Sequence, residues 1–188
     1  MTGSHPSTEP PPRARIRAPS VVIVNTGTAR ASRQPPSGAR CAVARGWRVC
    51  VVQFMKAGKW RVGEERSARS LGVERWTIGD GFSRDSKHMD QTEAIARDAW
   101  RTAREKLREP TYEHVILDEI TYPMNWGWIS TAEVVEAIKA RPANVNVIAT
   151  GRDDAPPELV DFADTVTEMR SRKHAFDRGV RAIRGIDF

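Results

Sequence analysis

The chain has 188 residues, of which 39% are hydrophobic and 29% charged, and its formal net charge is +6. This composition is that of a globular protein with a sizeable core. No apolar stretch is long enough to span a membrane and no signal-peptide pattern occurs, so we expect a cytoplasmic protein with no membrane partner. The positive charge fits either a nucleic-acid surface or a cleft for a polyanion such as a nucleoside triphosphate. Because the basic residues are scattered and no RNA-binding signature occurs, we do not expect nucleic acid as a partner.

Residues 1–19 contain Pro10-Pro11-Pro12 and several arginines, and they cannot bury a core. We expect a disordered, basic and proline-rich tail there, followed by a single domain over residues 20–188. Within that domain, short apolar runs predict strands at 21–24, 49–54, 73–78, 115–117, 145–148 and 165–167.

Two amphipathic helices are predicted among these strands. The first runs from Asp90 to Arg108, with an apolar stripe at every fourth residue: Ile95, Ala99, Ala103 and Leu107. The second opens at Ser130, ends at Arg141-Pro142 and buries Val134, Val135 and Ile138. This alternation predicts an α/β fold with a mostly parallel sheet covered by helices on both faces. Such sheets bind ligands at the carboxyl ends of their strands.

The segment after the first strand, Asn25-Thr26-Gly27, stands where a phosphate-binding loop is expected. Such a loop needs glycines, whose backbone N–H groups wrap phosphate, and a Lys beside a Ser or Thr. Residues 28–34 contain neither Gly nor Lys, and Pro35-Pro36 stands where the next helix should begin. The sequence therefore predicts a nucleotide site with a degenerate phosphate loop.

Polar residues follow three other predicted strands. Asp118 and Glu119 end an apolar run, where carboxylates hold Mg²⁺ or orient water beside a nucleotide, although ordinary solvated acids also occur there. Gln53 ends the second strand. Arg152 follows Thr150-Gly151. Its planar guanidinium could bind phosphate, but an ordinary surface arginine after a turn glycine explains the residue equally well.

Aromatic residues lie near these positions in the sequence. Phe82 stands in a glycine-rich loop, either as a lid over a ligand or as an anchor for its own loop. Tyr122, Trp126 and Trp128 follow the two carboxylates. This density of rings suits a large, flat, apolar ligand, while core packing or a dimer contact would also explain it.

Seven short motifs occur in an order and spacing that resemble one enzyme family. They are Val-Asn-Thr-Gly at 24–27, Val-Gln-Phe-Met-Lys at 52–56, Gly-Asp-Gly-Phe at 79–82, Leu-Asp-Glu at 117–119, Thr-Gly-Arg at 150–152, Val-Thr-Glu-Met-Arg at 166–170 and Lys-His-Ala-Phe-Asp at 173–177. From about residue 21 to residue 188 the chain resembles the ATP:corrinoid adenosyltransferases of cobalamin synthesis and salvage.

The resemblance implies a phosphate-loop NTPase-like fold and a homodimer. It also implies ATP as co-substrate with Mg²⁺ or Mn²⁺, a reduced corrinoid as substrate, and a flavoprotein as a candidate reductant. In that reaction cobalt(I) attacks C5′ of the ATP ribose and triphosphate leaves. The protein positions the reactants and neutralises charge on the leaving group.

Site residues carry over by position. Glu119 is implied as the metal-side catalytic carboxylate, with Asp118 as its catalytic neighbour. The implied nucleotide-binding residues are Asn25, Thr26, Gly27, Gln53 and Arg152. The implied corrinoid-side residues are Phe82, Arg84, Tyr122 and Trp126. Arg84 stands where the family commonly has Trp, and a cation cannot replace an indole in an apolar pocket.

We hypothesise that a local frameshift produced the degenerate loop. Codons allowed for residues 27–38, read one base out of phase, encode His-Gly-Lys-Gly-Lys-Ser-Thr-Ala-Ala-Phe-Gly, which is the family's loop. We hypothesise that the frame is restored before about Gly46. A sequencing error, a gene lesion and a functional variant are all compatible with this pattern.

Three functions stay open from the sequence. The first is an adenosyltransferase that is impaired as it stands. The second is a non-catalytic remnant that binds a corrinoid or a partner. The third is a different nucleotide-dependent enzyme on the same fold.

Overall fold

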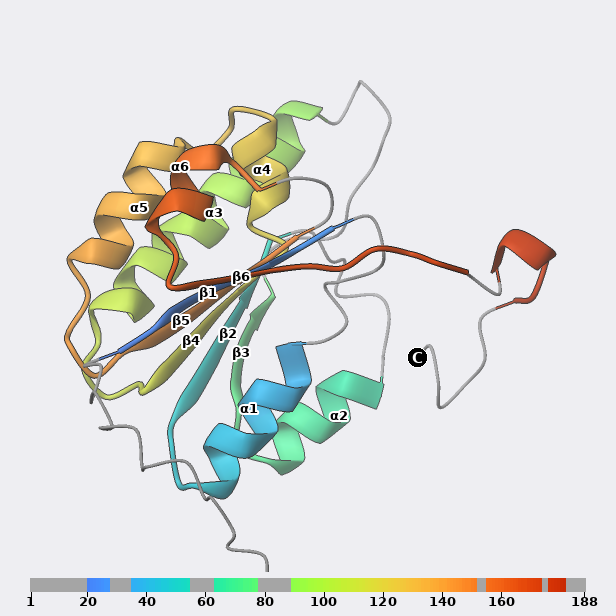
Figure 1. Cartoon of the computed structure of the whole chain (residues 1–188). Helices are drawn as coiled ribbons and strands as arrows, with labels where there is room; N and C mark the ends of the chain where they lie inside the picture. The colour runs from blue at the N-terminus through green and yellow to red at the C-terminus, as the bar shows by residue number, and fades with distance from the viewer. Residues whose placement is uncertain are drawn as a thin grey trace, which may run out of the picture.

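Among the described residues, six strands form one sheet in which every neighbouring pair is parallel, in the order β3-β2-β4-β5-β1-β6 (Figure 1). The computed structural model describes residues 20–27, 35–54, 63–77, 89–151, 155–173 and 176–181. The strands are β1 Val22–Thr26, β2 Val49–Gln53, β3 Glu74–Thr77, β4 His114–Asp118, β5 Asn146–Thr150 and β6 Thr165–Glu168. All six overlap the predicted strands, and the predicted α/β class is confirmed.

Helices cover both faces of the sheet. They are α1 Pro35–Ala44, α2 Gly63–Ser70, α3 Met89–Arg108, α4 Thr121–Asn125, α5 Thr131–Lys139 and α6 Pro157–Phe162, with a 3₁₀ turn, η3, at Phe176–Arg178. Helices α1 and α2 lie on one face, and α3 to α6 lie on the other (Figure 1). The two predicted helices are present as α3 and α5. Among the described helices, none is long and apolar enough to cross a membrane.

Helix α1 corrects the interpretation that Pro35-Pro36 opposes a helix start. The helix begins at Pro35 itself. Proline is tolerated in a first turn because its fixed φ suits the helix and its missing N–H would have no partner within the helix there. The two prolines therefore mark the beginning of α1.

The larger part of the core lies between the sheet and α3, α5 and α6, and a smaller cluster lies under α1. On α3 the predicted stripe is only partly right. Ala99, Ala103 and Leu107 are fully buried, but Ile95 is half-buried, whereas Trp100 is buried. A strict four-residue spacing drifts around a helix of 3.6 residues per turn, so the buried face turns away from Ile95.

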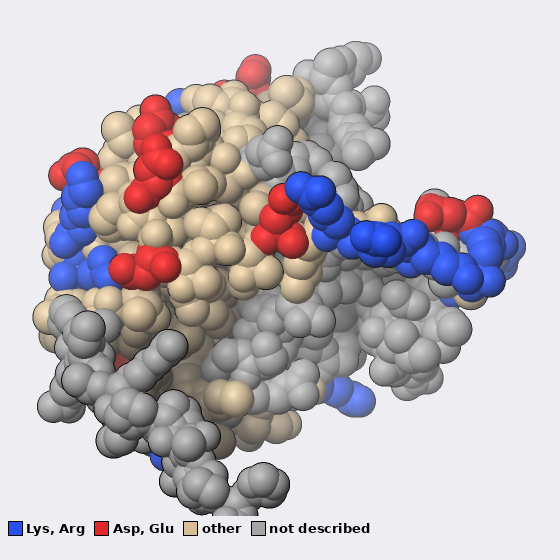
Figure 2. All heavy atoms as spheres, viewed as in Figure 1, with Lys and Arg blue, Asp and Glu red and all other residues tan. Residues whose placement is uncertain are grey.

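After β6 the chain leaves the body of the protein. Its residues 170–173 and 177–181 are exposed. Figure 1 shows this segment extending away from the sheet to η3, and Figure 2 shows Lys and Arg side chains gathered along it.

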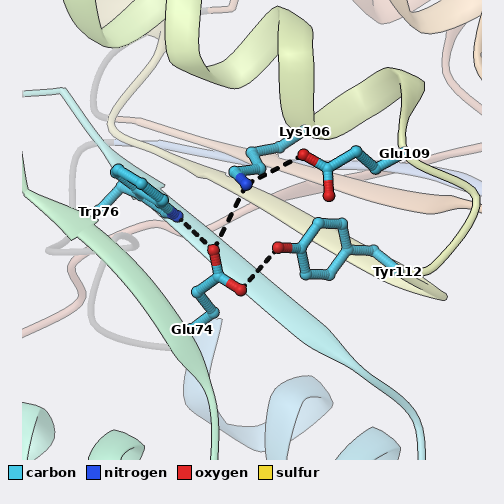
Figure 3. Close-up of polar contacts among 5 residues, drawn as sticks. All are labelled: Glu74, Trp76, Lys106, Glu109 and Tyr112. Atoms are coloured by element: carbon cyan, nitrogen blue, oxygen red, sulfur yellow. Dashed lines mark hydrogen bonds and ion pairs between the residues drawn. The ribbon is translucent and has the colours of Figure 1, made fainter.

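A polar cluster ties the edge strand β3 to α3 (Figure 3). Glu74 accepts hydrogen bonds from the Tyr112 hydroxyl at 2.6 Å and from the Trp76 indole at 2.7 Å. The Lys106 ammonium lies 3.5 Å from Glu74 and 2.9 Å from Glu109. Burial, together with the bond to Glu74, raises the pKa of Tyr112 to about 12. The cluster holds β3 in place beside β2.

Candidate active site

Three buried polar side chains join the carboxyl ends of β2, β4 and β5. The Gln53 amide donates to Oδ2 of Asp118 at 2.6 Å, and the Thr150 hydroxyl donates to Oδ1 of Asp118 at 3.0 Å. Gln53 and Asp118 are 3% exposed and Thr150 is 0% exposed. Both oxygens of the Asp118 carboxylate therefore accept hydrogen bonds, as a buried charge requires.

Alternation along the strands explains why these side chains meet. Val49, Ile116 and Ile148 pack in the cluster beneath α1. Side chains two or four residues further along a strand point to the same face, which carries Gln53, Asp118 and Thr150. The register aligns them, since Gln53 pairs with Asp118 across β2 and β4. The polar row thus faces α1, the helix that follows the degenerate loop.

Glu119 leaves the strand in an unusual backbone conformation. Its φ is 66°, and it is the only described residue other than glycine with a positive φ. Its N–H donates to the Thr150 hydroxyl at 3.0 Å. A left-handed backbone costs a side-chain-bearing residue about 1–2 kcal/mol, and such strain gathers at functional sites. The turn separates the Glu119 carboxylate from the buried row and leaves it half-buried at the sheet edge.

The residues Asn25, Thr26 and Gly27 end β1, on the other side of β5. Asn25 pairs with Thr150, and its carbonyl accepts the Gly151 N–H at 3.1 Å. Gly27 has φ 122° and lies against the backbone of the chain that follows β6. The beginning of the degenerate loop and the two carboxylates therefore lie at the same end of the sheet, where the strands have their carboxyl ends. Only β5 separates them.

Thr150, which belongs to this row, and Arg75, which contacts it, were not among the predicted site residues. Thr150 was quoted only as part of a motif, yet its hydroxyl joins Asp118 to the backbone of Glu119. Arg75 donates through Nε to the Gln53 carbonyl oxygen at 3.0 Å, and its NH2 group contacts the same oxygen. A Thr at the end of a buried strand is a weak signal. Nothing in the sequence indicated that Arg75 lies beside Gln53, because the pairing of β2 with β3 decides it.

The predicted aromatic cluster is present on the other face of the sheet, at α4. The rings of Tyr122 and Trp126 are 5.5 Å apart, and those of Trp126 and Trp128 are 4.6 Å apart. Trp126 is 42% exposed, whereas Trp128 is 8% exposed. Trp128 thus packs in the body, whereas Trp126 is partly exposed. Helix α4 begins two residues after Glu119, so the cluster adjoins the carboxylates in the chain.

The carboxylates present can bind a divalent cation only if phosphate oxygens and water supply its remaining ligands. No group of three or more His, Cys, Asp and Glu side chains occurs in the described ranges, so they build no complete protein cage. Mg²⁺ is ordinarily held by one or two carboxylates together with phosphate oxygens and water. Asp118 and Glu119 supply such oxygens.

Several predicted positions lie outside the described residues. These are Phe82, Arg84 and Arg152, together with residues 28–34 of the degenerate loop and the tail 1–19. The flanking elements are described. β3 ends at Thr77, whose hydroxyl donates to the Gln53 carbonyl oxygen at 3.3 Å.

Comparison with known proteins identifies relatives along nearly the whole chain. The family model described as "ATP:corrinoid adenosyltransferase BtuR/CobO/CobP" matches residues 19–188. The corrinoid adenosyltransferase of Escherichia coli K12 is 38% identical over 169 residues, which cover 89% of this chain and 85% of the relative. CobA of Salmonella typhimurium is 37% identical over 169 residues, with the same two coverages. The Pseudomonas aeruginosa enzyme is 36% identical over 172 residues, covering 89% of this chain and 83% of the relative.

Among solved structures, the RadB recombinase matches with a TM-score of 0.43 and 16% identity, covering 81% of this chain and 76% of that chain. The assignment to a family rests instead on the family model and on the three relatives above. The chain therefore belongs to the ATP:corrinoid adenosyltransferases, a family of enzymes.

Proposed function

We propose that this fold transfers the 5′-deoxyadenosyl group of ATP to the cobalt(I) of a corrinoid in adenosylcobalamin biosynthesis or salvage. Cobalt forms a bond to C5′ of the ribose, and the C5′–O bond breaks with its electron pair leaving on triphosphate. The observation that carries the proposal is the row Gln53–Asp118–Thr150 at the edge where β1 ends in Thr26-Gly27. Family membership supplies the reaction.

The carboxylates act on the triphosphate side in this proposal. Glu119, with Asp118 behind it, would hold Mg²⁺, which when bound neutralises charge on the phosphates. Asn25, Thr26, Gly27 and Gln53 line the same edge, and we assign them, with Arg152, to the nucleotide. The hydrogen bonds from Gln53 and Thr150 keep Asp118 fixed, and fixed charges need no rearrangement during the reaction.

We assign the aromatic side of the edge to the corrinoid. The exposed part of the Trp126 side chain, with Tyr122 beside it, suits a flat apolar macrocycle. Phe82 and Arg84 belong to the segment that leaves Thr77, and we assign them to the corrin's lower face. From the family resemblance alone, the proposal includes a homodimer, a flavoprotein reductant and a cytoplasmic location.

We further propose that the chain as it stands is severely impaired. Residues 28–34 contain neither glycine nor lysine, so they lack both the flexible backbone and the ammonium that cradle phosphates. Arg30 and Arg33 supply charge but do not replace those parts.

The test compares the chain as it stands with a loop-restored chain, in which residues 28–38 are replaced by His-Gly-Lys-Gly-Lys-Ser-Thr-Ala-Ala-Phe-Gly. Adenosylation of chemically reduced cobalamin is followed by absorbance, and ATP binding is followed by calorimetry. We expect near-zero turnover from the first chain and measurable turnover from the second. A third chain with the same eleven inserted residues in scrambled order controls for composition. Equal turnover in all three would show that the loop is not needed.

The degenerate loop also favours a second candidate function, a non-catalytic remnant that binds a corrinoid or a partner. The discriminating result is cobalamin affinity without ATP affinity in the chain as it stands, with no turnover after the loop is restored. Retained ATP affinity without cobalamin affinity would instead favour a different nucleotide-dependent enzyme.

A further inference from the structure

The chain that follows β6 begins beside the start of the degenerate loop. Thr26 pairs with Glu168, and the Met169 N–H donates to the Thr26 carbonyl at 2.8 Å. A Cβ added to Gly27 would lie 2.1 Å from the Met169 carbonyl oxygen, so the two backbones are in direct contact. Because β6 is parallel to β1, the residues after Met169 start at the carboxyl edge of the sheet, where residue 28 also starts.

This C-terminal segment, residues 170–181, is strongly basic. It contains one acidic residue, Asp177, and five basic residues: Arg170, Arg172, Lys173, Arg178 and Arg181. All five basic residues are exposed, and Figure 2 shows the charged arm that they form with their neighbours. The segment therefore presents positive charge outward from the edge that carries the nucleotide residues.

The charge nearest the sheet is already balanced. The Arg170 guanidinium makes a bidentate interaction with the Glu168 carboxylate. Its Nε donates to one oxygen at 2.7 Å, and a terminal nitrogen donates to the other at 2.9 Å. This pairing lowers the pKa of Glu168 and cancels the two charges. Arg172 and Lys173 are the next basic residues. They therefore make the electrostatic potential positive where the segment leaves the sheet.

We propose that Arg172 and Lys173 bind the triphosphate group, both as the tail of ATP and as the product of the reaction. A guanidinium fork and a compact ammonium are the side chains that bind phosphate oxygens best. This inference rests on the proposed function. It adds a second source of positive charge, from the C-terminal segment, to a site whose own loop lacks lysine.

The experiment titrates inorganic triphosphate into the loop-restored chain and into its double variant Arg172→Gln with Lys173→Gln. The control is Arg101→Gln with Arg108→Gln, which removes the same charge from exposed positions on α3, a helix on the face opposite α1. We expect the arm variant to bind about 25-fold more weakly at low ionic strength, about fivefold for each cation, while the control stays within about twofold of the parent. At about 0.5 M salt the difference should shrink to less than threefold.

Other outcomes overturn the inference in distinguishable ways. If the arm variant binds triphosphate as tightly as the control while the loop-restored chain still adenosylates cobalamin, the proposed function stands and the arm has no part in it. If the arm variant instead changes the sedimentation coefficient without changing triphosphate affinity, the segment contacts a second copy of the chain. If the loop-restored chain binds neither ATP nor triphosphate, both proposals fail. When the same substitutions are made in the chain as it stands, the ratio of triphosphate affinities between the arm variant and the control variant should be the same.

Discussion

The side-chain amide of Gln53 donates a 2.6 Å hydrogen bond to Oδ2 of Asp118 and thereby joins the ends of two neighbouring strands. The same Gln53 side chain accepts from Arg75 through its other atom, so the orientation of the amide is set from both sides. The carboxylate of Asp118 is therefore held from β3 across β2, and from β5 by Thr150.

In the loop-restored chain, replacing Gln53 by Leu should destabilise the fold and weaken ATP binding. The substitution removes a donor from Asp118 and an acceptor from Arg75, which leaves polar atoms with fewer partners in a buried place. We expect a loss of about 1–3 kcal/mol in the free energy of unfolding, measured in urea. Gln91→Leu makes the same change at an exposed position of α3 and should cost less than about 0.5 kcal/mol. Equal midpoints for the two variants would contradict the role given to Gln53.

The positive φ of Glu119 predicts that a glycine at this position relieves backbone strain but removes a functional carboxylate. In the loop-restored chain, Glu119→Gly and Glu119→Ala should both lose magnesium-dependent ATP binding, because both remove the carboxylate. The glycine variant should nevertheless be roughly 1 kcal/mol more stable than the alanine variant, because glycine adopts φ 66° without strain.

The matched pair for this comparison is Glu136→Gly and Glu136→Ala in the exposed middle of α5. There the order should reverse, with glycine about 1 kcal/mol less stable than alanine, because that backbone is helical. Urea unfolding of the four variants measures both differences. The same order at both positions would show that Glu119 does not store backbone strain.

Much of the sheet could be predicted because its strands are short apolar runs that end in polar residues. The run before Asp118-Glu119 is buried at every position of β4, as its sequence suggests. Helix α2 was missed because Gly63–Ser70 is almost entirely polar, and α4 because it has only five residues. Neither segment repeats an apolar residue over enough turns to show a helical period.

Some residues of the candidate site could likewise be predicted from the sequence, and others could not. Asp118, Glu119 and Gln53 stand at strand ends, so local pattern alone brought them into consideration. The role of Arg75 depends on β3 lying beside β2, with Gln53 opposite Thr77. Strand order and register arise from packing of the whole sheet, which a single sequence does not display.

Gly27→Ala should be much more damaging than an alanine at another left-handed glycine. At Gly27 the new methyl would meet Met169 backbone atoms at 2.1 and 2.6 Å, so β6 would have to move. Gly72 also has a positive φ, but a methyl group added there would meet nothing within 4 Å, so Gly72→Ala isolates the cost of the backbone conformation. We expect Gly27→Ala to cost about 1–3 kcal/mol more. Hydrogen exchange at the Met169 amide should accelerate only in the first variant, and unchanged exchange there would contradict the close contact.

His114 should make the stability of the fold depend on pH. It is 7% exposed at the start of β4, and neither ring nitrogen has a hydrogen-bond partner among the described residues. Burial lowers the pKa of His114 in the folded chain, whereas the unfolded chain titrates near the ordinary value of about 6.5. Below that value the unfolded state binds a proton that the folded state does not, so stability falls as the pH falls.

The variant His114→Leu removes this titration and keeps a similar volume. As the pH falls through the ordinary histidine pKa of about 6.5, the variant should lose less stability than the parent, because uptake of a proton at position 114 no longer favours the unfolded state. His5→Leu makes the same change near the start of the chain, well before β1 in the sequence, and should follow the parent at every pH. Urea titrations of the three chains give the result. Parallel pH profiles for His114→Leu and the parent would mean that His114 becomes protonated as readily in the folded chain as in the unfolded one.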